Sequence, residues 1–102
     1  MNEIKIIAEI GWNFLGDMNL AERMIVDAKK AGANIAKFQY WDPATLKSGA
    51  WDEDGRRQIY EKAALNDSKI NFLREICAKE GIEPLFSAFT LQGAKKLKEI
   101  GE

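Results

Sequence analysis

The sequence predicts an α/β fold of three consecutive strand–helix units with parallel strands. Apolar runs of strand length alternate with stretches in which apolar residues recur at helical spacing. Short turns, marked by Gly32 and Gly81, separate each helix from the next strand. Such turns favour parallel strands with right-handed crossovers, so the residues predict either a segment of a (β/α)8 barrel or a small doubly wound sheet.

Composition bounds the class of protein. The 102 residues are 46% hydrophobic and 30% charged, which is typical of one soluble domain. A net charge of −1 argues against nucleic acid and anionic membrane surfaces as partners. The sequence contains no apolar run of membrane-spanning length and no secretory leader pattern, and its single cysteine predicts a reducing, cytoplasmic environment. Histidine, the commonest general base and metal ligand, is absent.

The first unit is a strand over residues 4–10 followed by a helix. Asp17 and Asn19 supply capping oxygens, and lysines in the last turn suit the negative end of the helix dipole. One face of this helix carries the apolar stripe Leu20, Ala21, Met24, Ile25 and Ala28.

The second unit begins with a strand over residues 34–40 and has a long connection. Residues 41–66 hold turn signals and a short helical piece over residues 57–64 before the main helix, residues 68–80. A connection of this length has no packing purpose in a compact domain and usually carries function.

The third unit is a strand over residues 83–89, with Thr90 as the N-cap of a final helix. Leu91, Ala94, Leu97 and Ile100 form its apolar stripe, and Gly101 marks its end. A fourth strand is expected just where the sequence stops, so we expect the chain to be the beginning of a larger domain.

Parallel strands place ligand-facing groups at their carboxyl ends and in the loops that follow. The candidates on this rim are Glu9, Asn13, Lys37, Gln39, Ser87 and Phe89. Lys37 is the strongest signal, because an ammonium group beside a buried sheet is costly unless an anion meets it. The alternatives are a structural ion pair with Glu9 for Lys37, a loop-carbonyl contact for Gln39, and a backbone contact for Ser87.

Other chemistry-bearing residues have structural interpretations. The loop Gly11–Gly16 lacks the Lys-Ser/Thr of a phosphate loop and is interpreted as a tight strand-to-helix turn. The three tryptophans are interpreted as loop anchors, with stacking on a ligand as the alternative. Cys77 is assigned to packing rather than nucleophilic chemistry, and the acidic run Asp52, Glu53 and Asp54 to a solvated loop rather than a metal site.

Two segments resemble the opening of the sialic acid synthase family, the N-acetylneuraminate, legionaminate and pseudaminate synthases. Residues 7–17 read Ile-Ala-Glu-Ile-Gly-x-Asn-x-x-Gly-Asp, and residues 31–39 read Ala-Gly-Ala-x-x-x-Lys-Phe-Gln. The resemblance implies that residues 1–102 are the N-terminal (βα)3 part of a (β/α)8 barrel, incomplete in this chain. It implies further that the barrel remainder and an antifreeze-like domain, which completes the partner subunit's site in a homo-oligomer, are absent.

The resemblance also implies an activity: condensation of phosphoenolpyruvate with an N-acetylated amino sugar, such as N-acetylmannosamine, with a divalent metal (Mn²⁺ or Mg²⁺) whose ligands are not in this chain. Lys37 would then hold the phosphate or carboxylate of phosphoenolpyruvate, and Ser87 would contact the phosphate. Gln39 and Asn13 would bind substrate, and Glu9 would orient reactants or handle protons.

Two departures from the family pattern concern the pocket and a turn. Phe14 replaces the usual histidine, which we expect to alter the sugar side of the pocket, and Ala88 replaces a proline, which we expect to alter only a turn. Two alternatives stay open, namely a non-catalytic (βα)3 module that folds by oligomerising and a different phosphate-binding barrel enzyme.

Overall fold

A three-stranded parallel sheet forms the centre of the molecule. The computed structural model describes residues 3–45 and 47–101, and at Trp51 the backbone only. The strands are β1 (Ile7–Gly11), β2 (Ile35–Tyr40) and β3 (Glu83–Ala88), in the order β1-β2-β3. Both neighbouring pairs are parallel, as the sequence predicts.

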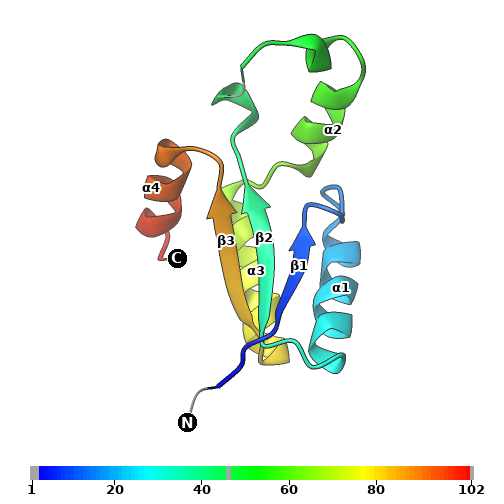
Figure 1. Cartoon of the computed structure of the whole chain (residues 1–102), viewed down its shortest axis with the longest axis vertical. Helices are drawn as coiled ribbons and strands as arrows, with labels where there is room; N and C mark the ends of the chain where they lie inside the picture. The colour runs from blue at the N-terminus through cyan, green and yellow to red at the C-terminus, as the bar shows by residue number, and fades with distance from the viewer. Residues whose placement is uncertain (1–2, 46, 102) are drawn as a thin grey trace.

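Three helices cover one face of the sheet. They are α1 (Met18–Lys30), α3 (Asp67–Glu80) and α4 (Leu91–Glu99). In Figure 1, α3 runs behind the sheet, with α1 beside β1 and α4 beside β3. Among the described residues, no helix is long and apolar enough to cross a membrane.

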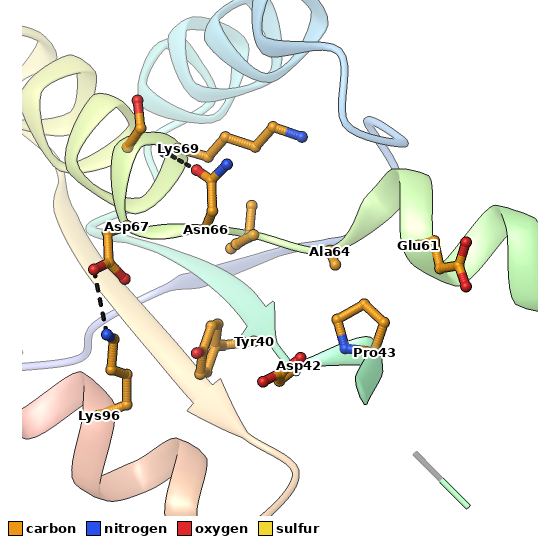
Figure 2. Close-up of a pocket in the computed structure, with 11 residues that line it drawn as sticks. Tyr40, Asp42, Pro43, Glu61, Ala64, Asn66, Asp67, Lys69 and Lys96 are labelled. Atoms are coloured by element: carbon orange, nitrogen blue, oxygen red, sulfur yellow. Dashed lines mark hydrogen bonds and ion pairs between the residues drawn. The ribbon is translucent and has the colours of Figure 1, made fainter. Parts of the chain in front are cut away.

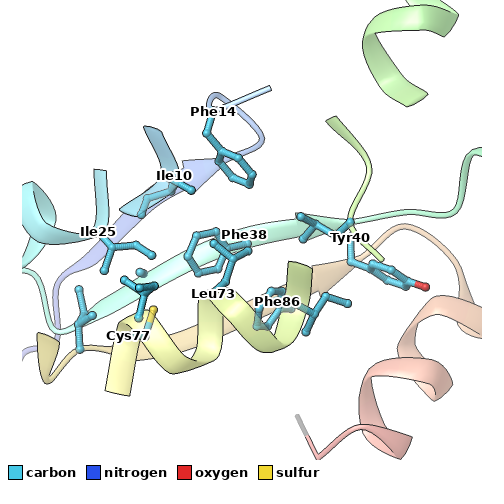
Figure 3. Close-up of a cluster of buried hydrophobic side chains, with 14 of the residues drawn as sticks. Ile10, Phe14, Ile25, Phe38, Tyr40, Leu73, Cys77 and Phe86 are labelled. Atoms are coloured by element: carbon cyan, nitrogen blue, oxygen red, sulfur yellow. The ribbon is translucent and has the colours of Figure 1, made fainter. Parts of the chain in front are cut away.

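The hydrophobic core fills the space between this sheet face and the helices (Figure 3). Phe38, at the centre of β2, is fully buried and lies 5.2 Å, ring centre to ring centre, from Phe86 of β3. Ile25 of α1 and Leu73 and Cys77 of α3 are also fully buried, which confirms that Cys77 is a packing residue. The predicted inward face of α1 is confirmed as well, since Ala21 and Ile25 are buried and Leu20, Met24 and Ala28 pack against the core.

Among residues 3–45 and 47–101, no helix lies over the opposite face of the sheet. Because side chains alternate along a strand, the residues between the core positions point to this open face. It carries the exposed apolar side chains of Ile7, 49% exposed, and Leu85, 39% exposed, and Leu85 is the register partner of Lys37. Its carboxyl-terminal half carries polar side chains, Glu9, Lys37, Gln39 and Ser87.

The long connection after β2 forms an excursion beyond the ends of the strands. It contains two 3₁₀ turns, η1 (Pro43–Thr45) and η2 (Ala50–Asp52), and the helix α2 (Arg56–Ala63). Figure 1 shows the excursion extending past the tips of the strand arrows. The short helix is thus confirmed, one residue earlier than expected.

Capping side chains determine where three of the helices begin. The Asp17 carboxylate accepts hydrogen bonds from the amides of residues 19 and 20, and the Thr90 hydroxyl accepts one from the amide of Gly93. Both caps are predicted by the sequence. The main helix starts earlier than predicted because the Asn66 side chain accepts from the amide of Lys69 and so makes Asn66 the cap.

Four strand boundaries differ from the predictions, two of them by one residue at the end of β1 (Gly11) and the start of β2 (Ile35). β1 begins at Ile7 rather than residue 4, because the carbonyl of Ile6 already accepts the amides of residues 34 and 35 where the ladder starts. β3 ends at Ala88 rather than residue 89. Between Glu9 and Gly11 the register with β2 shifts by one, so β1 carries one extra residue, Ile10.

Candidate active site

The carboxyl ends of the three strands carry the predicted site residues on the open face of the sheet. We call Glu9, Asn13, Lys37, Gln39 and Ser87 the rim cluster. Glu9 and Lys37 are direct register partners on β1 and β2, and the Lys37 Nζ lies 3.0 Å from the Glu9 Oε1. The two side chains remain 50% and 32% exposed, respectively, so the pair faces open space at the rim.

Three side chains of the rim cluster converge on Gly11. A Cβ at this position would lie 3.7 Å from the Glu9 Oε2, 3.7 Å from the Asn13 Nδ2 and 3.8 Å from the Gln39 Oε1. Gly11 has a φ of +61°, a left-handed conformation that favours glycine. The chain therefore turns at Gly11, where polar side chains from β1, β2 and the loop after β1 surround a backbone segment that carries no side chain.

The remaining contacts hold the cluster to the backbone. The Asn13 Nδ2 donates to the carbonyl of Ile10 at 2.9 Å, which fixes the loop after β1. Ser87 is the register partner of Gln39, and its hydroxyl donates to the carbonyl of Phe38 at 3.4 Å. The backbone contact weighed for Ser87 is thus present, and it is long enough to be a weak hydrogen bond.

An aromatic cluster joins the loops beside the rim. The Trp12 ring lies 6.0 Å from Trp41 and 5.8 Å from Tyr60 in edge-to-face contacts, while Trp41 lies 5.4 Å from Phe89. The Trp41 indole N–H donates to the carbonyl of Tyr60 at 3.2 Å, tying β2 to α2. The anchoring role of Trp12 and Trp41 is confirmed, and the prediction for the Trp51 side chain lies outside the described residues.

Sequence reasoning missed the part of Tyr60 in this cluster and placed Phe89 among ligand-facing groups. In the structure Phe89 follows β3 and packs on Trp41, although it remains 58% exposed. The available signal is positional, since Trp12, Trp41 and Phe89 each stand at or just after the end of a strand.

Phe14 does not border the rim. Its side chain is 1% exposed and packs edge-on against Phe38, at 6.3 Å between ring centres, on the helix side of the sheet. The expectation that this residue alters the sugar side of the pocket is therefore wrong. The Phe14 side chain belongs to the hydrophobic core instead.

The acidic run in the excursion is paired with arginines. Asp52 bonds Arg57, and the Asp54 carboxylate lies 2.8 Å from the Arg56 guanidinium. The backbone amide of Gly49 and the Arg57 guanidinium hold the pKa of Asp52 below its usual range, and Arg56 does the same for Asp54. Over residues 3–45 and 47–101, no group of three acidic, cysteine or histidine side chains is placed to hold a metal ion.

Comparisons with known proteins match this chain to synthases of sialic acid-type sugars. Residues 24–102 match the NeuB family. The pseudaminic acid synthase of Campylobacter jejuni is 31% identical over 96% of this chain, and the N,N'-diacetyllegionaminic acid synthase of the same species is 33% identical over 99%. The crystal structure of the N-acetylneuraminic acid (sialic acid) synthetase of Leptospira borgpetersenii, in complex with citrate, superimposes with a TM-score of 0.85 and 33% identity over 98% of the chain.

These matches cover a limited share of each relative. The chain spans 32% and 34% of the lengths of the two Campylobacter synthases and 34% of the Leptospira enzyme. The fold is thus the three-unit α/β segment that resembles part of those enzymes. By the extent of the family match, the chain belongs to the NeuB family.

Proposed function

We propose that this chain forms the phosphoenolpyruvate-holding part of a synthase that condenses phosphoenolpyruvate with an N-acetylated amino sugar to give a sialic acid-type nonulosonate and phosphate. Membership of the NeuB family supports the product class. The observation that carries the proposal is the position of the Lys37 ammonium group at the carboxyl end of the sheet. Its Nζ lies 3.0 Å from the Glu9 Oε1.

The rim cluster suits an anionic substrate. Phosphoenolpyruvate carries a phosphate and a carboxylate, and a fixed ammonium group at a sheet end stabilises such charge. Lys37 is positioned by Glu9 yet 32% exposed, so it can reach a ligand above the open face. The Ser87 hydroxyl, weakly bonded at 3.4 Å, is free to turn and donate to a phosphate oxygen.

The other members of the rim cluster would handle the sugar and the protons. Gln39 and Asn13 present amide groups beside Gly11, where they would bond sugar hydroxyls. In the condensation, the methylene carbon of phosphoenolpyruvate bonds to the aldehyde carbon, water adds to the former enol carbon, and phosphate leaves. Glu9 would orient the reactants or relay a proton between them.

The proposal also includes a metal ion, an oligomeric state and a cellular location, which do not depend on the side chains of the rim cluster. The divalent metal, Mn²⁺ or Mg²⁺, would polarise the aldehyde oxygen, and its ligands would belong to parts of the protein outside this chain. A homo-oligomer and a cytoplasmic location complete the proposal, the latter supported by a single cysteine that is buried.

Substitution of Lys37 tests the proposal, and the assay uses the longest form of the protein that occurs naturally and includes residues 1–102. We expect Lys37→Gln to lower kcat/KM for phosphate release by about 100-fold or more, because one charge-assisted contact to the anion is lost. Lys95→Gln, on the exposed side of α4, is the matched control and should leave kcat/KM unchanged. Equal activity of the two variants, or no release of phosphate by the unaltered protein, contradicts the proposal.

A further inference from the structure

A polar cavity lies on the helix side of the sheet, away from the rim cluster. Its volume is about 600 Å³, and it lies between the end of β2, the start of α3 and α4 (Figure 2). A smaller cavity of about 190 Å³ continues it toward the start of α4. Tyr40, Asp42 and Lys96 line both cavities, which we call together the Tyr40 groove.

The Tyr40 hydroxyl is the unusual group in this groove. Tyr40 is 8% exposed, and its ring belongs to the hydrophobic core. In Figure 2 its hydroxyl points into the cavity, toward Lys96 and Asp67. Within the described part of the chain, no hydrogen bond joins this hydroxyl to another residue, and the oxygen is accessible from the cavity rather than sealed in the core. A phenylalanine would fill the same core position without carrying a polar group that lacks a protein partner.

The charged groups around the hydroxyl indicate which classes of ligand the groove can bind. The Lys96 Nζ lies 3.3 Å from the Asp67 Oδ2, and both side chains are partly exposed. Asp42 and Glu61 add two further carboxylates, and Lys69 one further ammonium group. Three carboxylates against two ammonium groups disfavour a phosphate-like anion. The described acidic side chains also form no group of three that could hold a metal ion.

A neutral polyol fits the groups that remain. Its hydroxyls can donate to carboxylates and accept from ammonium groups and from a phenol. Burial and the charge of Asp42 raise the pKa of Tyr40, so its hydroxyl stays protonated at neutral pH and can donate. The cavity volume also lies within the range of about 300–1,000 Å³ that is usual for small-molecule sites.

We infer that the Tyr40 groove binds a small neutral ligand with several hydroxyl groups, of the monosaccharide or cyclic polyol class, through the Tyr40 hydroxyl and the Lys96–Asp67 pair. Gln39 and Tyr40 are neighbours on β2 and point to opposite faces of the sheet. The groove is therefore separate from the rim cluster, and the inference does not depend on the reaction proposed there.

Backbone amide NMR of the full chain, titrated with D-glucose and with myo-inositol, tests the inference. We expect saturable shifts at residues 66–69, 90, 92 and 93, which line the groove. Tyr40→Phe should weaken this binding by about tenfold or more, the effect of one lost hydrogen bond to a ligand, and leave the urea midpoint of unfolding unchanged. The matched control, Tyr60→Phe, removes a hydroxyl outside the groove and should bind like the unaltered chain.

Four results would overturn the inference. They are the absence of a saturable shift with either polyol, shifts confined to residues near Gly11, groove shifts with inorganic phosphate or Mg²⁺ but with neither polyol, and unchanged affinity in Tyr40→Phe. Should Tyr40→Phe fail to fold, Lys96→Met provides the same test, because it removes a second donor from a partly exposed side chain that lines the groove. Unchanged affinity in that variant would equally count against the site.

Discussion

Gly11 stands where the polar groups of the rim cluster meet, so a methyl group there tests how closely they must approach. We expect Gly11→Ala to lower the free energy of unfolding by about 1–2 kcal/mol, because φ is +61°. The new Cβ would also contact the side chains of Glu9, Asn13 and Gln39 and cover the backbone around which they gather, which should weaken binding of phosphoenolpyruvate. Urea unfolding and calorimetric titration with phosphoenolpyruvate measure the two effects.

Gly32→Ala is the control for this substitution. Gly32 also has a positive φ, +97°, but a Cβ there would meet no atom within 4 Å. It should lose similar stability and keep its affinity for phosphoenolpyruvate. If both variants bind phosphoenolpyruvate equally well, the convergence of side chains at Gly11 has no part in binding.

Some side-chain contacts could be predicted from the sequence and others could not. Glu9 and Lys37 each stand near the end of an apolar segment, and parallel pairing brings such positions to one height, so their contact follows from the pattern. The gathering of Asn13 and Gln39 at Gly11 does not follow, because it depends on the register shift in β1. Phe14 shows a further limit, since a loop residue can turn either to the rim or to the core.

The excursion after β2 is held against the loop after β1 by a close backbone contact. A Cβ added to Gly16 would lie 2.1 Å from the carbonyl oxygen of Lys62, near the end of α2. We therefore expect Gly16→Ala to cost more stability than Gly32→Ala, by about 1–3 kcal/mol, since the backbone has to move. Urea unfolding gives the difference, and equal losses in the two variants would show that the contact is dispensable.

Acid should weaken the excursion before the rest of the fold. The pKa values of Asp52 and Asp54 are lowered in the folded chain by their hydrogen bonds. The unfolded state then binds more protons, so this stabilisation is complete above the ordinary pKa of 3.8 and is lost as the pH falls below it. The protection factors of the α2 amides, which correct for the pH dependence of intrinsic exchange, should fall as the pH drops below about 4.

The double variant Asp52→Asn, Asp54→Asn tests whether these two carboxylates cause the acid response. Its α2 amides should exchange faster at neutral pH and show a smaller change on acidification. An acid response as large as that of the unaltered chain would assign the effect to other groups.

Most boundaries of the helices and strands could be predicted because local signals set them. Caps such as Asp17 and Thr90, and glycines such as Gly81, fix helix ends through nearby hydrogen bonds. The start of β1 could not be predicted, because it depends on where Asn34, far along the chain, meets Ile6. The path of the excursion likewise depends on Trp41 and Tyr60 meeting at long range.

The whole sheet presents an uncovered face and two outer strands, β1 and β3, so the 102-residue chain by itself should associate. Exposed Ile7 and Leu85 add apolar area to that face. We expect the sedimentation coefficient to rise with protein concentration. The double variant Ile7→Thr, Leu85→Thr should reduce this rise, because it makes the open face more polar.

Leu91→Thr is the control for surface hydrophobicity in general. Leu91 is 72% exposed but begins α4, away from the open face of the sheet. Its substitution should leave the concentration dependence as it is. Association that responds to Leu91 and not to the sheet residues would assign the contact to the helix side.

The extra residue in β1 also determines which deletions and insertions the segment before the rim cluster can tolerate. Ile10 packs in the core, while Gly11, next to it, is the register partner of Phe38 on β2. Loss of the Ile10 codon would restore an even ladder, but it would empty a core position and draw Asn13 back toward the strand. Anyone transplanting this motif into another scaffold must therefore copy the count of residues from Glu9 to Asn13 as faithfully as their identities.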